Sequence, residues 1–187
     1  MKKYSLILLV TILSLSLAGV TVAKGQPAGK GKLDVVINGG GIAVNENHGF
    51  GPITLLSVGG FSAKSYGDSA KGQIQSKSVN AEDTSDVWGS VHGSVVCVKN
   101  LGPNKNDDGF SGNVWEVRFQ VAKGSFLGAS LAGAYGSLFV LDGGRPGSGN
   151  DGIDEGFADP GSEFCGGDDA DSYNLEPVVA GNFTVHE

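Results

Sequence analysis

Residues 114–122, Val114-Trp-Glu-Val-Arg-Phe-Gln-Val-Ala122, carry the clearest structural signal in the chain. Their side chains alternate, with Trp115, Val117, Phe119 and Val121 on one face and Glu116, Arg118 and Gln120 on the other. A period of two is typical of a β-strand that has one face in a core and one in water. The stretch therefore predicts a half-buried strand, with Trp115 packed in the core.

Shorter runs of the same kind lie on both sides, separated by Gly, Asn and Asp. Residues 87–98 place Val91, Val95 and Cys97 in phase, which predicts that the Cys97 sulfur points inward. Residues 126–135 are interrupted by Gly128 and Gly133 and predict a loop with at most one helical turn. Further candidate strands are residues 33–44, 53–62, 72–79, 136–142 and 181–186. The pattern predicts an all-β fold, an antiparallel β-sandwich or barrel of about seven to nine strands.

Glycine makes up 32 of the 187 residues, more than twice its usual share of about 7%. The hydrophobic content of 40% excludes a disordered chain, and the lack of a three-residue glycine period excludes collagen. Each glycine inside a helix costs about 1 kcal/mol relative to alanine, so long helices are disfavoured. At residues 39–41 and 59–60 we expect turns or bulges.

The chain begins with the features of an export signal. Met1-Lys2-Lys3 precedes an apolar run over residues 6–17, and small residues lead to a cut after Ala23. We therefore expect a signal peptide over 1–23, a flexible basic arm over 24–32 and a single β-rich domain over 33–187. This predicts a secreted, extracellular protein that is not held in a membrane after signal cleavage. Its net charge of −7 disfavours nucleic acid as a partner.

Two cysteines occur in the sequence, Cys97 and Cys165. In an oxidising compartment they predict a disulfide, which at this loop length contributes roughly 4 kcal/mol in the chain-entropy model. The alternative is a pair of unrelated thiols, one in a strand and one in a loop.

Nine acidic residues lie between Asp142 and Asp171, together with nine glycines and one base, Arg145. Ca²⁺ prefers six to eight oxygen ligands and tolerates irregular geometry, and glycines let backbone carbonyls turn toward an ion. Candidate calcium ligands are Asp142, Asp151, Asp154 and Glu155, although their spacing differs from that of an EF-hand. The alternative is a set of solvated turns, and apart from calcium we expect no cofactor.

Motifs of nucleophilic or metal catalysis are missing from the sequence: no G-x-S-x-G elbow, Walker loop or H-E-x-x-H is present. His48, His92 and His186 are far apart, and His92 is predicted to lie at the surface. Two carboxylates could serve glycoside hydrolysis, but acids on glycine-rich loops are not held in position. We therefore assign no catalytic residue.

Several segments in sequence order together resemble the post-COAP type domain of exported bacterial proteins. They are Ile37-Asn-Gly-Gly-Gly-Ile42, Gly49-Phe-Gly51, Lys71-Gly-Gln-Ile-Gln75, His92-Gly-Ser-Val-Val-Cys97, Asp142-Gly-Gly-Arg-Pro-Gly-Ser-Gly-Asn-Asp151 and Gly181-Asn-Phe-Thr-Val-His186. The resemblance spans nearly all of 33–187 and implies a small β-rich extracellular module with no established activity. The chain departs from it by a longer insert at 126–135 and an enlarged acidic stretch at 155–171.

These patterns favour a secreted, non-enzymatic extracellular module that binds an extracellular partner or cell-surface component or has a structural role. One alternative is a calcium-dependent binding module that uses the acidic 142–171 loop. Another, from a different class, is a carbohydrate-active hydrolase.

Overall fold

Nine β-strands and no helix make up the described part of the chain, which in this computed structural model is residues 33–45, 55–66, 69–106, 108–144, 150–158, 163–166 and 173–187. The expected signal peptide and basic arm lie outside these residues. None of the described residues forms a helix long and apolar enough to cross a membrane. The strands are β1 Val35–Asn45, β2 Leu55–Tyr66, β3 Ser69–Asn80, β4 Val87–Pro103, β5 Asn113–Phe126, β6 Ala129–Ser130, β7 Tyr135–Leu141, β8 Gly152–Ala158 and β9 Glu176–His186.

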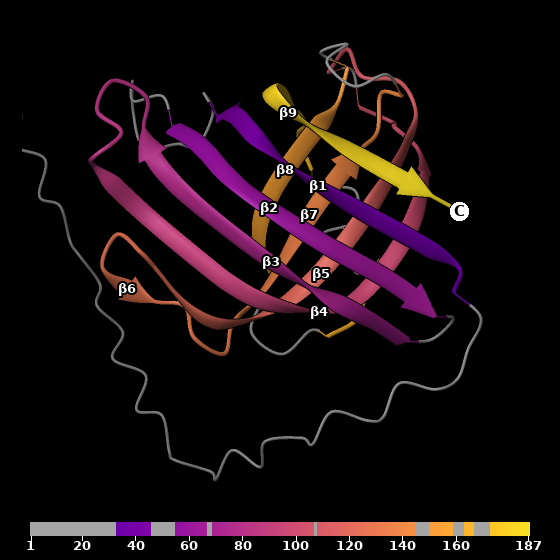
Figure 1. Cartoon of the computed structure of the whole chain (residues 1–187), viewed down its shortest axis with the longest axis horizontal. Helices are drawn as coiled ribbons and strands as arrows, with labels where there is room; N and C mark the ends of the chain where they lie inside the picture. Colours follow the sequence, from indigo (N-terminus) through magenta and orange to yellow (C-terminus); the bar gives the residue numbers. More distant parts are fainter. Residues whose placement is uncertain are drawn as a thin grey trace, which may run out of the picture.

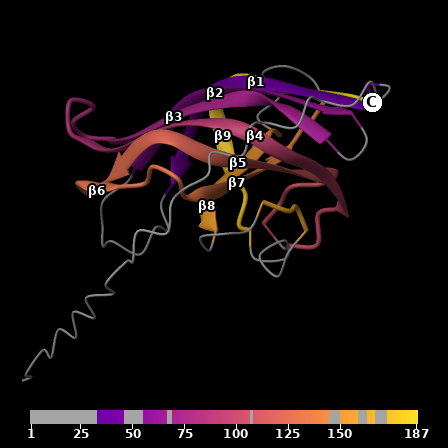
Figure 2. The same ribbon diagram turned by 90° about the horizontal axis from the view of Figure 1, so that it is seen from below.

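The strands form a closed antiparallel barrel, one of the two architectures that the sequence predicted. Hydrogen bonds join them in the order β4-β3-β2-β1-β9-β8-β7-β5-β6, and a further pairing of β4 with β5 closes eight strands into a ring that leaves β6 outside. β1 to β4 run side by side in one layer and cross over β5, β7 and β8 (Figure 1). Seen from below, this layer arches over the second one (Figure 2). Closure leaves few exposed strand edges.

Alternate side chains of the ring point inward and form the main core. Trp115 is 8% exposed and Val117 and Phe119 are fully buried, which confirms the inward face predicted for this strand. The glycines at 39–41 and 59–60 lie inside β1 and β2, where they pair with residues of the neighbouring strand. The expectation of turns or bulges at these glycines was wrong, since the β1–β2 pairing is continuous there and the irregularity between β1 and β9 lies at Ile42 and Ala43. A Cβ on Gly39 would overlap the ring of Phe183, so glycine is needed for the close approach of this ring.

The outer face of β5 and β7 is also buried, so the prediction of a half-buried strand at 114–122 was wrong. Glu116 and Arg118, expected in water, are each 1% exposed. A second cluster covers this face, with Val114, Phe139, Leu141, Tyr173 and Leu175 as its buried members. The alternating pattern could not show this, because the covering residues come from segments without strand periodicity.

Cys97 faces outward, contrary to prediction, because a β-bulge shifts the phase of β4. Val95 lies opposite the inward-facing Phe119, whereas Cys97 lies opposite Arg118. Directly paired residues share a face, and the extra residue between these pairs moves Cys97 to the outer side. The strand therefore aims the Cys97 sulfur at the segment that contains Cys165.

Residues 126–135 hold a tight hairpin and no helical turn. Leu127 and Gly128 both have positive φ, 49° and 81°, as a type I′ turn requires. Phe126 pairs with Ala129 and Ser125 with Ser130. The turn folds this segment back against β5.

Candidate functional site

One half of the barrel interior is hollow. A cavity of about 450 Å³ lies between β1–β5 and β7–β9, within the range of roughly 300–1,000 Å³ typical of small-molecule sites. An eight-stranded barrel is just wide enough for its side chains to fill it or for one small ligand. Small residues leave the space on the β1–β4 side, among them Gly41, Ser57, Gly59, Ser76, Ser78 and Gly89.

Glu155 extends from β8 into this cavity. Its Oε2 accepts a hydrogen bond of 2.7 Å from the hydroxyl of Ser76 on β3. β3 and β8 are four strands apart in either direction around the eight-stranded ring, so this bond spans the lumen. The second oxygen, Oε1, is buried and accepts no hydrogen bond from any described residue. Glu155 thus presents an unpartnered acceptor at the cavity wall.

Burial raises the pKa of Glu155 above its ordinary value of 4.5. The Ser76 hydroxyl opposes this shift because it stabilises the ionised form, whereas the negative charge of Asp154 adds to it. Burial likewise raises the pKa of Asp154, whose Oδ2 accepts a 2.9 Å hydrogen bond from the Asn174 N–H. Burial therefore disfavours the charged form of both carboxyl groups.

Glu155 is the acidic residue whose carboxylate points into the cavity, because Asp154 lies on the opposite face of β8. Among the described residues that line the cavity, none is Lys, Arg or His. The remaining wall is largely apolar, with Phe61, Ile74, Val91, Leu138 and Phe183 among its residues. The potential inside favours a positive group.

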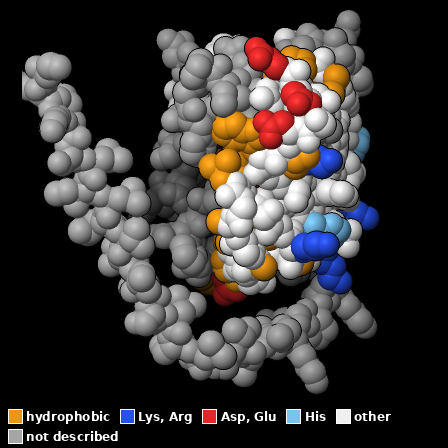
Figure 3. Space-filling view, turned by 90° about the vertical axis from the view of Figure 1, so that its left-hand side faces the viewer, with side chains coloured by type: hydrophobic (Ala, Val, Ile, Leu, Met, Phe, Trp, Pro, Cys, Tyr) orange, Lys and Arg blue, Asp and Glu red, His pale blue; other side chains and the backbone are white. Residues whose placement is uncertain are grey.

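The β5–β6 hairpin supplies an apolar border to the cavity. Phe126 and Leu131 line it, and the turn residue Leu127 is 55% exposed. The Leu127 N–H donates to the Trp88 carbonyl at 2.8 Å, which holds the turn against the start of β4 beside the exposed Val87. On this face hydrophobic side chains gather beside acidic ones, and Lys and His side chains lie toward one edge (Figure 3).

Two of the four predicted calcium ligands, Asp142 and Asp151, lie together at the edge of β9. Asp151 accepts from the backbone N–H groups of Gly143 at 2.9 Å and Phe183 at 3.0 Å. Asp142 accepts from those of Gly144 at 2.8 Å and Val185 at 2.9 Å. Because β8 pairs with β9 over two residue pairs, these carboxylates take the place of a neighbouring strand along the rest of this edge.

The other two, Asp154 and Glu155, are adjacent on β8 and therefore point to opposite faces. Across the described residues, no three His, Cys, Asp or Glu side chains are grouped as a metal site requires. Parts of the predicted loop, residues 145–149, 159–162 and 167–172, lie outside the description. Calcium binding at Asp142, Asp151, Asp154 and Glu155 stays a prediction.

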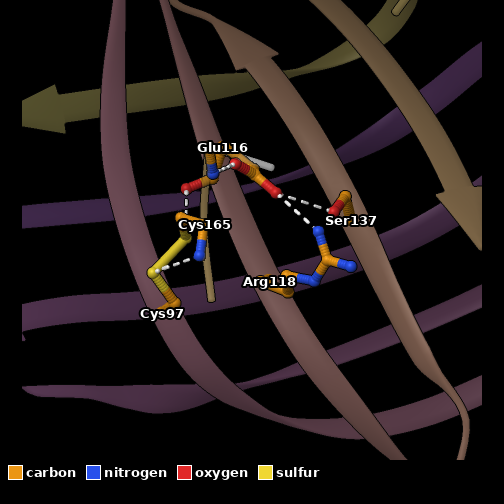
Figure 4. Close-up of a disulfide and its surroundings, with 6 residues drawn as sticks. Cys97, Glu116, Arg118, Ser137 and Cys165 are labelled. Atoms are coloured by element: carbon orange, nitrogen blue, oxygen red, sulfur yellow. Dashed lines mark hydrogen bonds and ion pairs between the residues drawn. A yellow bond between two sulfur atoms is a disulfide. The ribbon is translucent and has the colours of Figure 1, made fainter. Parts of the chain in front are cut away.

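The predicted disulfide between Cys97 and Cys165 is confirmed, with a Cα–Cα distance of 5.8 Å. It places Gly166 so that its N–H donates to Glu116 Oε2 at 2.6 Å. The other oxygen, Oε1, accepts from Ser137 Oγ at 2.9 Å and forms an ion pair with Arg118 at 3.2 Å (Figure 4). Gly166 has φ +74° and the Lys99 side chain lies against it, so glycine is needed there.

Sequence reasoning missed the hollow half of the barrel, although a signal exists in β3. In this strand, exposed side chains alternate with small or buried ones. The exposed residues are Lys71, Gln73, Gln75 and Lys77, and the inward ones are Ala70, Gly72, Ile74, Ser76 and Ser78. Small inward side chains mark a strand that lines a space. The role of Ser76 as the partner of Glu155 has no such signal, because the two are 79 residues apart.

Searches of known protein families, of curated proteins and of solved structures find no match to this chain. The resemblance to post-COAP type domains therefore stays a prediction.

Proposed function

We propose that the protein is a secreted, non-enzymatic binding module whose barrel cavity holds a small organic molecule. The observation that carries this proposal is the buried Oε1 of Glu155, which has no hydrogen-bond partner among the described residues, at the wall of a cavity of about 450 Å³. A buried acceptor without a partner costs about 1–3 kcal/mol, and more when it is charged. A ligand that donates a hydrogen bond to this oxygen would remove the cost.

The contrast between the two halves of the interior also supports a binding role. Protein interiors are normally packed as tightly as organic crystals, and the half around Val117, Phe119 and Val140 follows this rule, with all three fully buried. The half lined by Ser57, Ser78 and the glycines leaves its volume open. A cavity of this size with apolar walls and a few polar groups is typical of a ligand site.

A binding role fits these acids better than hydrolysis does. Hydrolysis of a glycosidic bond needs two carboxyl groups that face each other across the bond. Here Asp154 and Glu155 point to opposite faces of β8, and Asp154 accepts the Asn174 N–H. Export is supported by the N-terminal sequence pattern and by the disulfide.

The proposal is tested with N-phenyl-1-naphthylamine, an uncharged fluorescent probe for apolar cavities. We expect a saturable rise in its fluorescence with the purified protein. Ser78→Leu, which fills the cavity, should weaken binding about tenfold, the effect of about 1.4 kcal/mol. The matched control is Ser94→Leu on the exposed outer face of β4, which should bind as the wild type does. Non-saturable fluorescence, or equal binding by both variants, would refute the proposal.

A further inference from the structure

We infer that the ligand of this cavity is an organic amine, with a protonated nitrogen that donates to Glu155 Oε1 and an apolar body against the barrel wall. This inference rests on the proposed function and adds the chemical class of the ligand. Three features of the site carry it: its charge, its single unpartnered acceptor and its aromatic wall.

The charge of the cavity wall selects a cation. The Glu155 carboxylate lies on it, and none of the described residues that line the cavity is Lys, Arg or His. Carboxylates removed from water without a counter-charge are unfavourable. Attraction between unit charges strengthens as the dielectric constant falls, so a cation inside the barrel is stabilised more than one at the surface, whereas an anion is repelled.

The geometry of Glu155 selects a hydrogen-bond donor. Ser76 holds the Oε2 atom at 2.7 Å across the lumen, and this bond fixes the carboxylate while Oε1 stays without a described partner. An ammonium group carries N–H donors and no acceptor, so it matches an ionised carboxylate. The serine hydroxyls that line the cavity, such as Ser57 and Ser78, can accept further N–H bonds.

The remaining wall suits an apolar body. The rings of Phe61 and Phe183 lie with their centroids 5.5 Å apart and tilted by 50°, and both rings line the cavity. Such rings pack against hydrocarbon and also attract a cation over their faces. A molecule with an ammonium group at one end and an aryl or alkyl body therefore matches both parts of the site.

The test compares three probes of one shape that differ in the terminal group: 4-phenylbutylamine, 4-phenylbutanol and 4-phenylbutyrate. Titration calorimetry near neutral pH measures their dissociation constants. We expect the amine to bind at least about tenfold more tightly than the alcohol, as a charge-assisted hydrogen bond implies, and the carboxylate to bind more weakly than the alcohol. Glu155→Gln should bring the amine to within about twofold of the alcohol. Glu82→Gln, at an exposed position in the β3–β4 turn, should leave the tenfold preference intact.

Each outcome separates this inference from the proposed function. Equal binding of amine and alcohol by the wild type, or a preference for the carboxylate, would overturn the amine class while leaving the cavity as a binding site. An amine preference that survives Glu155→Gln would overturn the role of Glu155. A failure of all three probes, together with N-phenyl-1-naphthylamine, would overturn the proposed function itself.

Discussion

Two glutamates place carboxylate oxygens out of contact with water, and their surroundings differ. Glu116, on the outer face of β5, forms an ion pair with Arg118 at 3.2 Å. It also accepts hydrogen bonds from the Ser137 hydroxyl at 2.9 Å and the Gly166 N–H at 2.6 Å. Glu155, inside the barrel, accepts from Ser76 at 2.7 Å, and its other oxygen is without a described partner. One carboxylate is fully satisfied by the fold, and the other is not.

The difference indicates what each site is for. A carboxylate whose oxygens are all bonded by the chain has nothing left for a ligand, and its removal disturbs the structure that was built around it. A carboxylate with a free, desolvated oxygen beside a cavity contributes little to stability and retains its capacity to bind. We therefore assign the Glu116 network to stability and the Glu155 site to binding, and three predictions test this assignment.

The largest effect is expected from removal of the disulfide with Cys97→Ala and Cys165→Ala together. The 68-residue separation gives a loss of about 4 kcal/mol in the free energy of unfolding by loop-closure entropy. Gly166 is also released from Glu116. Urea denaturation measures the loss, and reduction of the wild type by dithiothreitol should reproduce it. A loss below about 1 kcal/mol would mean that other contacts hold residues 163–166 in place.

Glu116→Gln should cost about 3 kcal/mol, because it removes the negative charge that pairs with the buried Arg118 guanidinium. Urea denaturation again provides the measurement. The double variant Glu116→Gln with Arg118→Met removes both charges and should be more stable than the single variant. If Glu116→Gln unfolds within about 1 kcal/mol of the wild type, the outer-face network is not a stabilising unit, and the contrast with Glu155 is lost.

The fold was readable from the sequence because strand periodicity is local. The inward face of 115–121, the all-β class and the disulfide partners follow from alternation, turn residues and cysteine count. Cys97 was placed on the wrong face since a bulge adds one residue between Val95 and Cys97, and no composition rule reports such an insertion.

The site was less predictable, because it depends on contacts between distant segments. Glu155 was selected as an acid in a glycine-rich stretch, yet its environment comes from Ser76 and from the small residues of β1 and β2. Glu116 and Arg118 looked solvent-facing, since alternation cannot reveal that residues 163–166 and 173–175 cover them. Asp142 and Asp151 were predicted as calcium ligands, which stays a prediction, but the sequence did not show that their oxygens accept backbone N–H groups of β9 and of the adjoining loop.

The smallest effect is expected from Glu155→Gln, the same substitution at the other glutamate. It should change the free energy of unfolding by less than about 1 kcal/mol near neutral pH, because Gln keeps an acceptor for Ser76 and removes a poorly compensated charge. The matched surface control, Glu82→Gln, should change it by less than about 0.5 kcal/mol.

The pH dependence of this small difference separates the two glutamates. Since burial raises the pKa of Glu155 above 4.5 in the folded protein, the folded state binds more protons than the unfolded state between these two pKa values. The stability of the wild type must fall as pH rises through that window. Glu155→Gln has no carboxyl group to titrate at this position. The variant should therefore gain stability relative to the wild type from about pH 4.5 upward, until the pH exceeds the pKa of Glu155 in the folded protein. Asp154, whose pKa is also raised, is present in both proteins, so the difference reports Glu155 together with its electrostatic coupling to Asp154. Urea denaturation at a series of pH values measures the difference in the free energy of unfolding between the variant and the wild type.

This difference could also stay flat across the window or shrink as pH rises. Either result would show that ionised Glu155 is as well compensated in the fold as a carboxylate in water. The reason to treat its Oε1 as a binding group would then be removed.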